Sequence, residues 1–132
     1  MSRLVESFVV LTTLLAQRIV AKDSATANTV VYPASKESLP LGVTLDTVLD
    51  TTSAIPVQCN GRAKVYFNDT VAAGALVAAD TSGRGIPFVM PNTTTSVTLA
   101  GAYAGILLGP AVAATGAIQE ILINPGYVRQ SV

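Results

Sequence analysis

The sequence predicts an all-β protein, a small antiparallel β-sandwich or barrel built from two similar β units, with an extended N-terminal arm. The β-branched residues Val, Ile and Thr recur along the whole chain, and they fit a pleated, half-buried surface better than a helix. Short apolar runs are separated by Gly, Pro, Asn and Asp, which is typical of many short strands. A chain of 132 residues is long enough for one domain with its own core.

The two halves of the chain resemble each other. Residues 16–24 align with residues 73–81, and each run holds an apolar strand followed by a polar turn. Identical residues stand at Ala16 and Ala73, Val20 and Val77, Ala21 and Ala78, and Asp23 and Asp80. Two further pairs of runs follow in the same order, 42–45 with 105–108 and 54–55 with 117–118. The chain therefore reads as two versions of one β unit.

The first half begins with an apolar segment. Residues 1–15 are assigned to the N-terminal arm, although a first strand or one helical turn would also suit them. The β domain is assigned to residues 16–126. Within it, residues 18–21 and 29–32 are expected to pair as a hairpin, and residues 42–45 form the next strand.

The dipeptide Asn60-Gly61 separates two apolar runs, 55–59 and 63–67. Asn-Gly in such a position is a strong signal for a two-residue turn, so a second hairpin is expected here. Alternation along the second run directs one set of side chains to the core and the other set outward. The inward set is Ala63, Val65 and Phe67, and the outward set is Arg62, Lys64 and Tyr66.

The second half repeats this scheme with longer connections. A strand within residues 71–80 is followed by a long loop over 81–96, which is long enough to be functional. Strands over 104–107 and 119–123 are expected to close the sheet. Asn124-Pro-Gly126 is expected to end it, which leaves residues 127–132 as an extended C-terminal tail.

No charged residue occurs from Ile86 to Gln119, and this stretch contains overlapping GxxxG patterns, which are typical of membrane helix dimers. Pro110 and Gly116 would interrupt such a helix. The aligned region of the first half also carries two carboxylates, at Asp46 and Asp50. A buried strand, loop and strand is therefore the favoured interpretation, and no membrane partner is expected.

The composition limits the possible functions. Half of the residues are apolar and only 12% are charged, which favours permanent association with other chains. Eight basic and eight acidic residues are scattered singly, and this disfavours nucleic-acid binding. The sequence has no histidine and a single cysteine, Cys59, so it lacks the commonest general base and cannot form an internal disulfide.

The remaining candidates for chemistry are weak. Asp46 and Asp50 could be a carboxylate pair, but Val48 and Leu49 stand between them, and a calcium loop needs more oxygen ligands at regular spacing. Cys59 alternates with Val57, which favours a small buried hydrophobe over a reactive thiol. We therefore expect no catalytic residue, no metal and no cofactor, and we do not expect an enzyme.

The order of motifs resembles that of tailed-phage capsid decoration proteins, also termed head cement proteins. The likeness runs from about residue 17 to residue 126. It is carried by Arg-Ile-Val-Ala-Lys at 18–22, Pro-Leu-Gly-Val-Thr-Leu at 40–45, Ile-Pro-Val-Gln-Cys-Asn-Gly-Arg-Ala-Lys-Val at 55–65, Val-Ala-Ala-Gly-Ala-Leu-Val-Ala-Ala-Asp at 71–80, Ala-Gly-Ile-Leu-Leu at 104–108 and Ile-Leu-Ile-Asn-Pro-Gly at 121–126.

This resemblance implies a structural virion protein on the outer surface of the phage head. Such a protein stabilises the capsid by bridging neighbouring subunits of the major capsid protein, and it is commonly a homotrimer. We expect the apolar N-terminal segment to contact the capsid and the charge-free stretch to form the trimer. The residues expected at the capsid are Phe8, Val9, Val10, Leu11 and Leu14, and those expected between protomers are Leu99, Tyr103, Ile106 and Leu107.

Two other readings remain. A head-fibre module with the same fold would bind a receptor or glycan through the 81–96 loop, although the chain has four Tyr and no Trp for stacking on sugars. A small membrane-associated oligomer would be built on residues 97–118.

Overall fold

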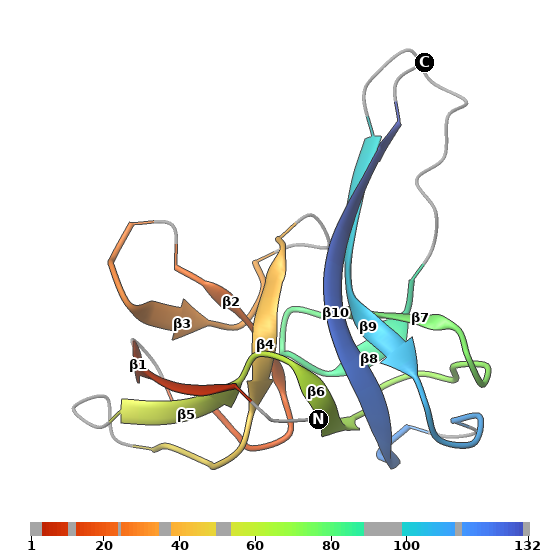
Figure 1. The fold of residues 1–132 in the computed structure, drawn as a ribbon, viewed down its shortest axis with the longest axis horizontal. Helices are drawn as coiled ribbons and strands as arrows, with labels where there is room; N and C mark the ends of the chain where they lie inside the picture. Colours follow the sequence, from red (N-terminus) through yellow and green to blue (C-terminus); the bar gives the residue numbers. More distant parts are fainter. Residues whose placement is uncertain are drawn as a thin grey trace.

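The computed structural model describes residues 4–10, 13–23, 25–34, 38–49, 54–88, 99–112 and 115–130. Every regular element in these ranges is a β-strand, and the strands form two sheets (Figure 1). The predicted all-β class is therefore confirmed. No helix in the described ranges is long and apolar enough to cross a membrane.

The first β unit is a closed five-stranded barrel with the order β1-β3-β2-β4-β5. Its strands are β1 (Val5–Val10), β2 (Ile19–Lys22), β3 (Thr29–Val31), β4 (Pro40–Thr44) and β5 (Ala54–Gln58). The expected hairpin of β2 and β3 is present as an antiparallel pair. Strand β1 closes the barrel, because it pairs antiparallel with β5 and parallel with β3.

The second β unit is a five-stranded sheet with the order β6-β10-β9-β7-β8. Its strands are β6 (Gly61–Tyr66), β7 (Leu76–Ala79), β8 (Gly85–Pro87), β9 (Leu99–Leu107) and β10 (Ile118–Gln130). The predicted alternation in β6 is confirmed for its inward residues Ala63, Val65 and the following Phe67, which are buried, and for Arg62 and Lys64, which are exposed. Tyr66, also expected to face outward, is half-buried.

The two units share one topology, which confirms the duplication. The first unit has the neighbour order β3-β2-β4-β5-β1, and the second has β8-β7-β9-β10-β6. These orders are identical when β1 is matched with β6, β2 with β7, and so on along the chain. The parallel contact of β1 with β3 also has a counterpart, a parallel bridge between Phe67 and Gly85.

Asp23 and Asp80, which are aligned in the two units, both accept hydrogen bonds from backbone N–H groups of the following turn. The Asp23 carboxylate accepts a hydrogen bond from the backbone N–H of Thr26 at 2.9 Å. The Asp80 carboxylate accepts from the N–H groups of Ser82 and Arg84, both at 2.9 Å. A carboxylate that binds backbone N–H groups a few residues ahead stabilises a tight turn, which explains the identity at these positions.

The buried side chains form two clusters, one centred on each unit. The first cluster contains Val10, Leu14, Val20, Val30, Val48, Ile55 and Val57. The second contains Ala63, Val65, Phe67, Val71, Val77, Ala79, Ala104, Leu107, Val112, Ile121 and Ile123, together with Ile19 and Val43 from the first unit. Since two first-unit side chains belong to the second cluster, the units share part of their core.

The expectation of an N-terminal arm is wrong over the described residues of 1–15. Val5–Val10 is strand β1 of the barrel, and the side chains of Val10 and Leu14 are buried. The reason is that β3 and β5 each leave one edge unpaired, and β1 satisfies the backbone groups of both edges. The alternative of a first strand, also open from the sequence, is the one observed.

The hairpin expected at Asn60-Gly61 is also wrong. Strand β5 pairs with β1 and β4, whereas β6 pairs with β10, so the dipeptide is the crossover between the two units. Gly61 has a φ of 78°, which glycine adopts without strain. The Gln58 side-chain amide fixes this corner, because its Nε2 donates to the carbonyls of Asn60 at 2.8 Å and Arg62 at 2.6 Å.

The described part of the expected C-terminal tail, residues 127–130, instead belongs to a strand. Strand β10 continues to Gln130 and pairs with the full length of β9, with a register shift between Ile123 and Gly126. A β-bulge accommodates residues that cannot pair, and Pro125 in the shift has no N–H to donate. The described part of the expected 81–96 loop includes β8, and residues 89–96 lie outside the described ranges.

Strand β9 settles the reading of the charge-free stretch. Leu99–Leu107 is a strand, so the favoured interpretation is confirmed there and the helix suggested by the GxxxG patterns is not formed over these residues. Figure 1 shows β9 and β10 side by side as a long ribbon that extends away from the other strands. The sequence placed both strands correctly but underestimated their length.

Candidate functional site

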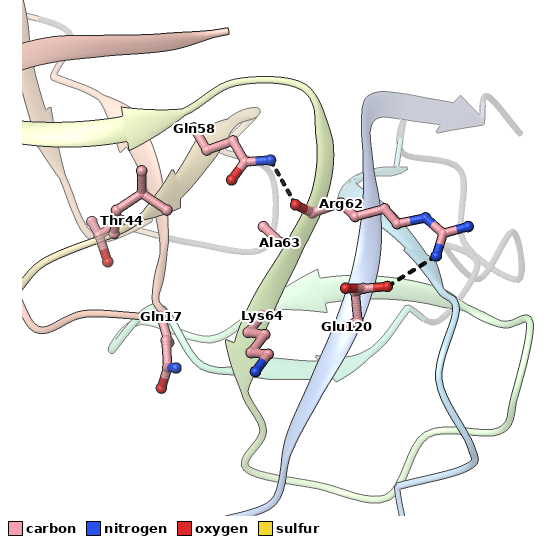
Figure 2. Close-up of a pocket in the computed structure, with 8 residues that line it drawn as sticks. Gln17, Thr44, Gln58, Arg62, Ala63, Lys64 and Glu120 are labelled. Atoms are coloured by element: carbon pink, nitrogen blue, oxygen red, sulfur yellow. Dashed lines mark hydrogen bonds and ion pairs between the residues drawn. The ribbon is translucent and has the colours of Figure 1, made fainter. Parts of the chain in front are cut away.

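A cavity of about 280 Å³ lies where the two units meet (Figure 2). Strands β4 and β5 of the first unit and β6 and β10 of the second contribute to its lining. The lining residues are Gln17, Thr44, Leu45, Gln58, Arg62, Ala63, Lys64 and Glu120.

The inner wall of the cavity is polar, and its side chains are hydrogen-bonded. Thr44 and Gln58 are both buried. The Thr44 hydroxyl donates to the Leu15 carbonyl at 2.6 Å and accepts from the Arg18 N–H at 3.1 Å. These bonds, with those of the Gln58 amide, satisfy polar groups that would otherwise destabilise the buried wall.

The outer rim carries the charges. Arg62 and Lys64 project from the same face of β6, and Glu120 on β10 is the cross-strand neighbour of Lys64. The Glu120 carboxylate nevertheless pairs with Arg62, with Nη1 to Oε1 at 3.4 Å. This ion pair is exposed, with 70% and 38% of the two side chains accessible, so it contributes little to stability. The Lys64 ammonium makes no hydrogen bond or ion pair with the described residues.

Gln17 joins the two units through its backbone. Its N–H donates to the Thr44 carbonyl at 2.9 Å, and its carbonyl accepts from the N–H of Tyr66 in β6 at 2.9 Å. Its φ of 61° lies in the left-handed region. The sequence signal for this residue is its alignment with Gly74, which is too weak on its own to mark a site.

The cavity is lined by groups that can bind a partner through hydrogen bonds and charges. Its described lining provides amides, two cations, one carboxylate and one hydroxyl, and the Thr44 hydroxyl is already engaged with backbone groups. Among the described residues no three His, Cys, Asp or Glu side chains gather as metal ligands. Asp46 is exposed, and its suggested partner Asp50 lies outside the described ranges.

The five residues expected to contact the capsid do not share one surface. Val10 and Leu14 are buried in the core of the first unit, so this part of the expectation is wrong. Phe8 is half-buried and Val9 is 48% exposed, while Leu11 lies outside the described residues. Leu4 and Val5 are exposed as well, and Val5 shares a face of β1 with Val9. These two residues could not be picked out without knowing that β1 is a strand and how its side chains alternate.

The residues expected between protomers are likewise divided. Leu107 is only 1% exposed and belongs to the core, so that assignment is wrong. Tyr103 and Ile106 are half-buried, and the Tyr103 ring meets that of Phe88 edge to face at a centroid distance of 5.5 Å. Leu99 begins β9, and its side chain is outside the described ones.

Among the described residues, the outer part of the β9–β10 ribbon pairs with no further strand on either edge. Strand β6 pairs with β10 only as far as Ile123, and β7 pairs with β9 only at Gly105 and Ile106. From Gly126 to Gln130, β10 pairs with β9 alone. A two-stranded ribbon is marginally stable in water, and its open edges can pair with another chain.

Cys59 follows β5 and is half-buried, with its Sγ 3.7 Å from the Val57 carbonyl oxygen. Burial raises the pKa of this thiol, and the negative charge of Glu6 raises it further. The thiol is therefore protonated and poorly nucleophilic near neutral pH.

The chain matches no protein-family model and no curated protein. Among solved structures, its fold is similar to that of the head fiber gp8.5 N base in bacteriophage phi29. The TM-score is 0.66, the sequences are 14% identical, and the match covers 93% of this chain and 95% of that one. The similarity therefore includes both β units, and at this identity it establishes a shared fold.

Proposed function

We propose that this chain is a structural protein of a tailed-phage head. It binds the outer surface of the shell and stabilises it by bridging neighbouring subunits of the major capsid protein. The main support for this proposal is the similarity of the fold, over 93% of this chain, to that of a phage head-fibre base. The resemblance of the sequence to head cement proteins supports the same function.

Self-association belongs to this proposal. The outer ribbon of β9 and β10 leaves backbone groups unpaired on both edges in the described chain, and a second and third copy would satisfy them. A trimer that touches several capsid subunits gains avidity, because its second and third contacts form within one complex. Light scattering on the purified chain tests this directly, and a monomer at micromolar concentration would contradict it.

The capsid-binding surface is assigned to the exposed face of β1. Val5 and Val9 lie on the same face of β1 and are 40% and 48% exposed, and exposed apolar side chains on one face of a strand favour a protein partner. The protein acts in this role by binding alone, without catalysis or a cofactor. Binding only the assembled shell stabilises that shell by mass action.

Purified heads that lack the protein provide the test. We expect the chain to co-sediment with them at a saturating ratio and to raise their resistance to heat. The double variant V5K/V9K should bind at least tenfold more weakly, because it places two charges in an apolar contact. The matched control is L39K/L49K, which places two lysines at exposed apolar residues outside β1 and should bind normally. Deleting residues 1–15 is unsuitable, since it would remove β1 from the barrel.

A second function is favoured by the nature of the matched structure, which is itself the base of a head fibre. In that case the chain would anchor a receptor- or glycan-binding element to the head. Heads with and without the protein can be compared for adsorption to host cells. Adsorption that depends on the protein, with unchanged heat resistance of the head, would favour the fibre base over the cement role.

A further inference from the structure

Gln17 adopts a backbone conformation that its side chain disfavours. Its φ is 61°, whereas the corresponding turn of the second unit has Gly74 at 77°. A third turn has Gly116 at 93°, and all three residues stand two positions before a strand. Residues with a side chain rarely adopt this region, and among them Asn and Asp are tolerated better than Gln. Glycine would therefore serve this turn better, and the presence of Gln requires another reason.

The Gln17 and Lys64 side chains both line the cavity between the units. Figure 2 shows the polar ends of these two side chains pointing in the same direction. Neither polar end has a hydrogen-bond partner among the described residues. Strained residues that keep an unused polar group at a cavity are typical of binding sites.

The charges that line the cavity favour the binding of an anion. Glu120 neutralises Arg62, although it is the cross-strand neighbour of Lys64, so the Lys64 ammonium stays without a counter-charge. An ammonium and an amide N–H donor that line the same cavity offer charge-assisted hydrogen bonds to a carboxylate. The cavity volume of about 280 Å³ is small for a cofactor, and Leu45 and Ala63 offer apolar contact for a short stem.

We propose that this cavity receives an acidic side chain of the capsid protein, held by Lys64 Nζ and the Gln17 amide. The inference rests on the proposed function for the identity of the partner. A single exposed ion pair gives little affinity on its own, so a protein partner that makes other contacts is a better fit than a free small acid. The acidic side chain would fix the register of the protein on the shell.

Co-sedimentation of the full chain with undecorated heads tests this proposal. K64Q should weaken binding about tenfold, in line with the loss of one member of a charge pair at an interface. The matched control is K22Q, which removes the same charge at an exposed lysine of β2 and should bind as the wild type does. Raising the salt concentration should weaken the wild type more than K64Q.

The variant Q17G separates binding from folding. Glycine suits the left-handed turn, so its thermal midpoint should rise by a few degrees while its binding to heads weakens about threefold. A K64Q or Q17G protein that binds like the wild type would overturn the carboxylate site alone. A K64Q protein that loses self-association would overturn the capsid protein as the occupant. Heads that bind no wild-type protein would overturn the proposed function and this inference with it.

Discussion

The two β units have the same strand order but different extents. In the first unit, β4 and β5 have five residues each, and the barrel is closed by β1. In the second unit, the corresponding strands β9 and β10 have nine and thirteen residues, and their outer parts form the ribbon. One copy of the duplicated unit is therefore a compact barrel, while the other carries a ribbon whose edges pair with no other described strand. This difference fits the proposal that the first unit binds the shell and the second assembles with other copies.

The largest loss of stability is expected at the parallel contact that each unit makes between its first and third strands. Phe67 closes the second unit and is fully buried against Gly85, where an added Cβ would lie 2.6 Å from the Phe67 ring. We expect F67A to lose about 3–5 kcal/mol of unfolding free energy. Val10 closes the first unit, and V10A should lose about 2 kcal/mol because its side chain is smaller. Urea denaturation measures both, and an equal or smaller loss for F67A would contradict this comparison.

The two units should respond alike at Gly42 and Gly105, which align in the duplication. An added Cβ would collide with the backbone carbonyl oxygen of Gln58 at the first position and of Leu122 at the second. Alanine at either site should destabilise the fold by about 1–3 kcal/mol, because a backbone carbonyl in a strand cannot move aside. A large loss at one glycine with none at the other would show that the units are not equivalent there.

A smaller change in stability is expected at the turn where the first unit has Gln17 and the second has Gly74. Q17G should stabilise the fold by about 1 kcal/mol, and the reciprocal G74Q should destabilise it by about the same amount. The space around a Cβ at Gly74 is open, so backbone strain alone would act there. Thermal unfolding of the two variants provides the measurement. Destabilisation by Q17G would mean that the glutamine is structural.

The smallest effect on stability is expected from Cys59, whose raised pKa makes the stability of the fold depend on pH. The folded protein holds the thiol proton more tightly than the unfolded chain does, mainly because burial disfavours the thiolate. This contribution to stability is complete below the pKa of the unfolded thiol and is lost as pH rises through the folded pKa. Alkylation of the folded protein should therefore be slower than that of the urea-unfolded chain at pH 8. E6Q, which removes the second cause, should lower the pKa and speed alkylation slightly.

Much of the fold could be predicted because the two copies constrain each other. The strand class, the duplication, the first hairpin and the inward face of β6 follow from local residue patterns. The crossover at Asn60-Gly61 could not be predicted, because the dipeptide specifies a sharp turn and leaves open which strands pair across it. The length of β10 was missed because Pro125, a normal strand breaker, lies in a β-bulge.

The candidate site was less accessible from the sequence. Its lining comes from segments as far apart as Gln17 and Glu120, which only the packing of the two units brings together. Val10, Leu14 and Leu107 were taken for contact residues since apolar character alone does not distinguish core from interface. Their burial assigns them to the core.

The most direct test of the proposed function is cryo-electron microscopy of undecorated heads mixed with the purified chain. A capsid-bridging protein should add density on the outer surface of the shell, at sites between neighbouring capsid subunits, with the barrel against the shell. Heads without added density, or density confined to the tail, would contradict it.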